Sequence, residues 1–72
     1  MIPHFGVFYD PTTSVVTRIV HIDYNKSDSE DNVKAGLRAH RLPKERIIFI
    51  PKHKAGDLDL ILSGLGVKRV AS

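Results

Sequence analysis

The chain has 72 residues, a net charge of +3 and no cysteine, which excludes disulfide bridges and thiolate metal sites. This length allows one domain, residues 1–72, whose core alone supplies only about 3–5 kcal/mol of stability. No stretch has the pattern of a secretion signal or the roughly 20 apolar residues of a membrane span, so we expect a cytoplasmic protein that does not enter a membrane. A partner surface that completes the small core would add stability, so we also expect a homodimer.

The first part of the chain predicts a β-hairpin. Alternating residues from His4 to Tyr9 and β-branched residues from Val15 to Asp23 indicate two strands. Asp10 and Pro11 supply the turn between them, with the Asp10 side chain expected to bond the backbone just beyond.

The next element is a helix over residues 29–41. Ser27 and Glu30 have capping-box spacing before it, and Pro43 ends it. We expect its buried stripe to consist of Val33, Gly36, Leu37 and His40.

The most apolar stretch of the second part is Ile47–Ile50, within a predicted strand Arg46–Pro51 that needs both faces covered. A loop over residues 52–57 follows it. The spacing of Leu58, Ile61, Leu62 and Leu65 then predicts a second helix, and residues 67–72 predict a short edge strand.

The resulting order ββαβαβ predicts an α/β fold, with α+β as the alternative. We expect a small two-layer sandwich in which a four-stranded mixed sheet carries both helices on one face. In this arrangement the last three strands are parallel, and the first lies antiparallel at an edge. The opposite face would be bare, which is a second reason to expect a homodimer.

Positive charge is concentrated in residues 34–54, which hold seven lysine and arginine residues against one glutamate. Parallel strands would also bring together the loops at residues 23–27 and 52–56, where helix N-termini favour anions. The residues that we predict to bind nucleic acid or another anion are Lys26, Arg38, Arg41, Lys44, Lys52, His53 and Lys54. The alternative is that this charge only solvates the surface.

These patterns predict a small binding module that contacts an anionic partner, with nucleic acid as the first candidate. The alternative is a protein-interaction module, a small inhibitor or adaptor of the kind that mobile elements encode, that uses the exposed sheet face around Phe8, Val16 and Val20. We do not expect an enzyme, because the only acid–base arrangement is His21 or Asp23 beside His53. The four histidines have no metal-ligand spacing, so neither metal nor cofactor is expected.

Overall fold

The computed structural model describes residues 2–22 and 29–69. It contains one three-stranded antiparallel sheet and two α-helices, an α+β arrangement. Strand β1 (Pro3–Asp10) lies in the middle of the sheet, between β2 (Val15–His21) and β3 (Arg46–Pro51).

The central position of β1 differs from the sequence-based expectation of an edge strand. Val7 of β1 lies opposite Ile19 of β2 on one side and Ile48 of β3 on the other, and both pairings are antiparallel. Because β2 and β3 are both antiparallel to β1, they run in the same direction, as expected, but β1 lies between them and the expectation that they are neighbours is wrong. Val7 and Phe8 of β1 point to opposite faces and are both fully buried, so both faces of this strand are covered, and the middle of the sheet is the position that shields such a strand most completely.

The fourth strand expected over residues 67–72 is not confirmed. Within the described residues, this segment forms a single parallel bridge between Lys68 and Val15. Its hydrogen bonds run from the Val16 amide to the Lys68 carbonyl at 2.7 Å and from the Lys68 amide to the Ser14 carbonyl at 2.8 Å. Residues 70–72 lie outside the described part of the chain.

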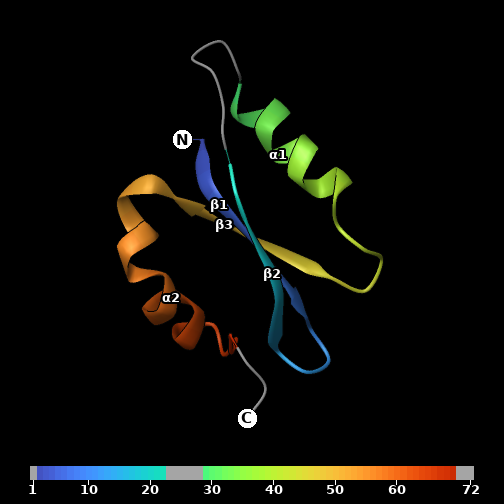
Figure 1. Cartoon of the computed structure of the whole chain (residues 1–72), viewed down its shortest axis with the longest axis vertical. Coiled ribbons are helices and arrows are strands. Elements are labelled where there is room, and N and C mark those ends of the chain that lie inside the picture. Colours follow the sequence, from blue (N-terminus) through green and yellow to red (C-terminus); the bar gives the residue numbers. More distant parts are fainter. Residues whose placement is uncertain (1, 23–28, 70–72) are drawn as a thin grey trace.

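The two helices cover opposite faces of the sheet. Leu37 of α1 (Glu30–Ala39) packs against Gly6, where an added Cβ atom would lie 3.1 Å from a Leu37 methyl group. Leu62 of α2 (Leu58–Gly64) instead belongs to the core cluster that contains Val7. Since consecutive strand residues point to opposite faces, the chain forms three layers, as Figure 1 shows. The expectation of two layers with both helices on one face is wrong.

This arrangement covers both faces of β3, as its apolar sequence requires. Ile48 and Ile50 pack in the α2 layer, while Ile47 lies near Gly6 in the α1 layer. The bare sheet face expected for a homodimer is therefore occupied by a helix, and the homodimer stays a prediction that rests on the small core. Phe8, expected at the exposed face, is fully buried.

The N-terminus of α1 is capped two residues later than the sequence suggested. Ser29 is the N-cap, and its hydroxyl oxygen accepts the Asn32 amide at 3.1 Å; the expected cap residue Ser27 lies outside the described residues. Within the predicted stripe, Leu37 is buried and Val33 half-buried, whereas Gly36 and His40 are exposed.

The segment before α2 also differs from expectation. Residues predicted as a loop form a short 3-10 helix, η1 (Lys52–Asp57), which leads directly into α2. In the described part of the chain, no helix is long and apolar enough to cross a membrane.

Candidate functional site

The structure divides the predicted basic residues between the two ends of β3. Arg41 and Lys44 precede this strand, whereas Lys52, His53 and Lys54 follow it on η1. The six residues of β3 separate the two groups by roughly 15–20 Å.

Arg38, another residue of the predicted set, lies apart from both groups. Arg38 projects from α1, with its guanidinium carbon 5.3 Å from the centre of the Phe49 ring, a cation–π distance. Lys26 lies outside the described residues.

The ends of β2 and β3, where an anion site was expected, are separated by β1. The first residues of β1 occupy the intervening space, with Pro3 opposite Pro51. The acid–base pair considered from the sequence is also separated by β1, because His21 ends β2 and His53 follows β3. Asp23, the alternative member of that pair, is outside the described residues. The structure does not bring that pair together.

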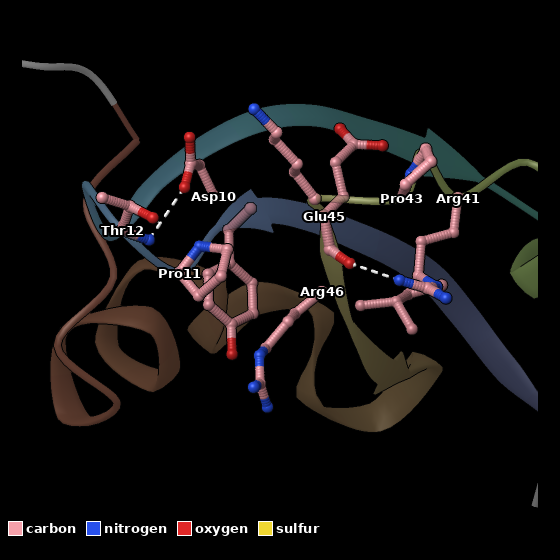
Figure 2. Close-up of a pocket in the computed structure, with 10 residues that line it drawn as sticks. Asp10, Pro11, Thr12, Arg41, Pro43, Glu45 and Arg46 are labelled. Atoms are coloured by element: carbon pink, nitrogen blue, oxygen red, sulfur yellow. Dashed lines mark hydrogen bonds between the residues drawn. The ribbon is translucent and has the colours of Figure 1, made fainter.

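A groove lies at the other end of the sheet, where Arg41 and Lys44 meet the hairpin. It is open, has a volume of about 930 Å³, and is lined by the Tyr9–Thr12 turn, by part of the segment before β3 and by the start of β3. Figure 2 shows these three segments converging. Arg46, at the start of β3, adds a third cation to the groove.

The groove is built around Glu45, a buried residue that is only 5% exposed. Its carboxylate accepts hydrogen bonds from Arg18 Nη2 at 2.8 Å, from the Thr17 hydroxyl and from the Leu42 amide at 3.0 Å. The Arg18 guanidinium, followed by the Thr17 hydroxyl and the Leu42 amide, lowers the pKa of Glu45 to about 2. Glu45 is therefore a charged anchor that ties the segment before β3 to strand β2.

The backbone of Glu45 holds a cation in place as well. Its carbonyl accepts a hydrogen bond from Arg41 Nη1 at 2.8 Å, and its amide donates to the Leu42 carbonyl at 3.0 Å. Figure 2 shows the Arg41 bond as a dashed line. The turn that contains the anchor thus also orients the Arg41 guanidinium.

Arg18 connects the same turn to the sheet beneath it. Its Nη2 also donates to the His40 carbonyl, and its guanidinium carbon lies 4.3 Å from the centre of the Phe8 ring. One arginine therefore neutralises the buried carboxylate, satisfies the end of α1 and covers the buried Phe8 ring.

The remaining side chains leave the groove with an excess of positive charge. The Asp10 carboxylate accepts the Thr12 amide at 2.8 Å, which stabilises the turn. Arg46 lies opposite Tyr9 in the β1–β3 register, and its side chain and the Glu45 carboxylate point in opposite directions (Figure 2). Lys44 and Arg46 are both exposed, so their cations face solvent, whereas the Glu45 charge is paired with Arg18.

Sequence reasoning identified the basic residues but missed the anchor. The partners Arg18 and Glu45 are 27 residues apart, and no local pattern links them. A usable signal was present, because Glu45 is the one acidic residue in the basic segment 34–54. Such an isolated counter-charge suggests a structural pair.

The histidines and acidic residues are the side chains that could hold a metal ion in a chain without cysteine. In the described ranges 2–22 and 29–69, no group of three or more such side chains is placed to hold a metal ion. Comparison of the chain with protein-family models, with curated proteins and with solved structures gives no match.

Proposed function

We propose that this protein is a small binding module that contacts an anionic partner, with nucleic acid as the first candidate, through the groove that carries Arg41, Lys44 and Arg46. The observation that supports this proposal most strongly is that these three basic residues all line one open groove. Cationic clusters of this kind attract phosphate groups, whose neutralisation provides most of the affinity for a nucleic-acid backbone.

The three cations differ in how firmly they are held. Arg41 is oriented by the Glu45 carbonyl through one of its nitrogens, and an arginine has five N–H donors, so others remain to bind a phosphate oxygen. Lys44 is exposed and acts as a mobile point charge. An oriented guanidinium binds phosphate with a smaller loss of side-chain entropy than a free one.

An aromatic ring lies beside these charges. Tyr9 lines the groove, is half-buried and faces Arg46 across the β1–β3 pairing. Aromatic rings next to a basic track stack on bases in single strands, where every base presents a π face. Tyr9 also packs against the core cluster, so stacking of a base on its accessible part is the feature that would favour single-stranded over duplex nucleic acid.

The lysines after β3 form a second, separate group of cations. Lys52 and Lys54 are exposed on η1, and they provide a charge-matched comparison at a distance from the groove. Reversing the charge of two residues in the groove or of two residues on η1 changes the net charge of the chain by the same amount. The pair whose reversal weakens binding more therefore identifies the binding surface.

The proposal is tested by fluorescence anisotropy with labelled single-stranded and duplex oligonucleotides at low and moderate salt. We expect the Lys44→Glu/Arg46→Glu chain to bind at least about tenfold more weakly than the parent chain. We expect the Lys52→Glu/Lys54→Glu chain to lose less. The proposal is wrong if the parent binds no oligonucleotide at low salt, and the groove assignment is wrong if the two variants lose affinity equally.

A further inference from the structure

Two histidines that are distant in sequence meet at one corner of the sheet. His4 on β1 and His21 on β2 lie with their Nε2 atoms 3.3 Å apart. Their rings are in an edge-to-face arrangement, with centroids 4.6 Å apart. The Nε2 atoms of the two imidazoles therefore lie at the contact between the rings.

The surroundings hold both rings in this arrangement. The Phe5 ring contacts His4 at a centroid distance of 4.7 Å and His21 at 5.4 Å. The backbone is joined at the same place, since the Ile22 amide donates to the His4 carbonyl at 2.9 Å. Side chains on paired strands are more precisely placed than side chains on loops, so the pair is organised before any ligand arrives.

We propose that His4 and His21 form a chelating site for a divalent late transition-metal ion, with water completing the coordination. Neutral imidazole Nε2 is the commonest protein ligand for such ions. Two Zn–N bonds of ordinary length at a tetrahedral angle place their nitrogens about 3.3–3.4 Å apart, which matches the separation seen here. The site is independent of the cationic groove, which lies at the opposite end of β1.

Metal binding requires a change of tautomer but no net loss of a proton from the pair. In the metal-free pair, one Nε2–H donates to the other Nε2. In the metal-bound pair, both Nε2 lone pairs point at the ion and both rings carry their proton on Nδ1. For two imidazole ligands, the expected affinity order is Cu²⁺ above Ni²⁺ and Zn²⁺.

The test uses the full chain without a histidine tag, titrated with zinc chloride and followed by long-range ¹H–¹⁵N spectra of the histidine side chains. We expect the Nε2 resonances of His4 and His21 to shift together and to saturate at one equivalent of zinc. His40 and His53, which lie on other elements, are the internal reference, and we expect no shift in their resonances.

A pair of variants completes the test. His21→Gln keeps a polar side chain at the exposed position but removes one ligand, and we expect it to weaken zinc affinity by at least about tenfold. His53→Gln is the matched control and should bind zinc like the parent chain. The proposal is overturned if millimolar zinc leaves the His4 and His21 resonances unchanged, if all four histidines respond equally, or if His21→Gln binds like the parent.

Discussion

The buried charge of Glu45 makes a specific prediction for stability and its dependence on pH. Replacement by glutamine keeps the size and polarity of the side chain but removes the charge that pairs with Arg18. A pKa lowered from 4.5 to about 2 corresponds to an upper limit of about 3 kcal/mol. The Arg18 side chain is 39% exposed, so solvent screening reduces the expected loss for Glu45→Gln to about 1–2 kcal/mol at pH 7.

The pH dependence follows from the direction of the pKa shift. Because folding lowers the pKa of Glu45, its charge contributes fully above the unfolded value of 4.5, and the contribution is lost as the pH falls toward 2. We therefore expect the parent and Glu45→Gln chains to differ by a constant free energy of unfolding between about pH 5 and pH 7. Below this range their stabilities should converge.

Urea denaturation followed by circular dichroism measures this difference across the pH range, and thermal melting should show a loss of about 5–15 °C at pH 7. Asp59→Asn is the matched control, because Asp59 pairs with Arg69 while both side chains are more than half exposed. The control should change stability by no more than about 0.5 kcal/mol. A difference between parent and Glu45→Gln that persists unchanged at pH 2, or that is absent at pH 7, would refute the role given to Glu45.

Two further predictions concern the layers that support the groove. Leu62→Ala should cost about 2–5 kcal/mol, because Leu62 is 1% exposed, whereas Leu60→Ala should have little effect because Leu60 is 74% exposed; denaturation midpoints that shift equally would contradict the assigned packing of α2. Ser29→Ala should cost about 1 kcal/mol and reduce helical ellipticity by loss of the N-cap bond; unchanged stability would show that this cap does not hold α1.

The sequence predicted the local elements far better than their arrangement. The apolar run Ile47–Ile50 correctly placed β3 at Arg46–Pro51, and the spacing of Leu58 and Leu62 correctly placed α2. Both signals are local, since they depend on side-chain periods of two and 3.6 residues. The Asp10 turn was predicted for the same reason and is confirmed by its bond to the Thr12 amide.

Strand order could not be obtained in the same way, because it depends on which surfaces meet. Parallel crossovers were expected from the alternation of strands and helices, but β1 buries side chains on both faces and takes the central position. That choice also places the helices on opposite faces. The apolar run Ile47–Ile50 needs cover on both faces, and one helix on each face provides it. The sequence-based expectation was that a second copy of the chain would cover the second face.

The candidate site shows the same division between local and long-range information. Charge counting along the chain identified Arg41 and Lys44, but it did not separate them from Lys52 and Lys54, which β3 places at its other end. The pair of Arg18 with Glu45 depends on contacts 27 residues apart. Contacts of this range become visible only when the sheet is assembled.

The salt dependence of oligonucleotide binding tests the central claim most directly. If Lys44 and Arg46 each neutralise a phosphate, then Lys44→Gln/Arg46→Gln should reduce the slope of log affinity against log salt by about 1.4 for single strands and about 1.8 for duplexes. Lys52→Gln/Lys54→Gln should leave the slope close to that of the parent chain. An unchanged slope for the groove variant would contradict the claim that this groove binds a phosphate backbone.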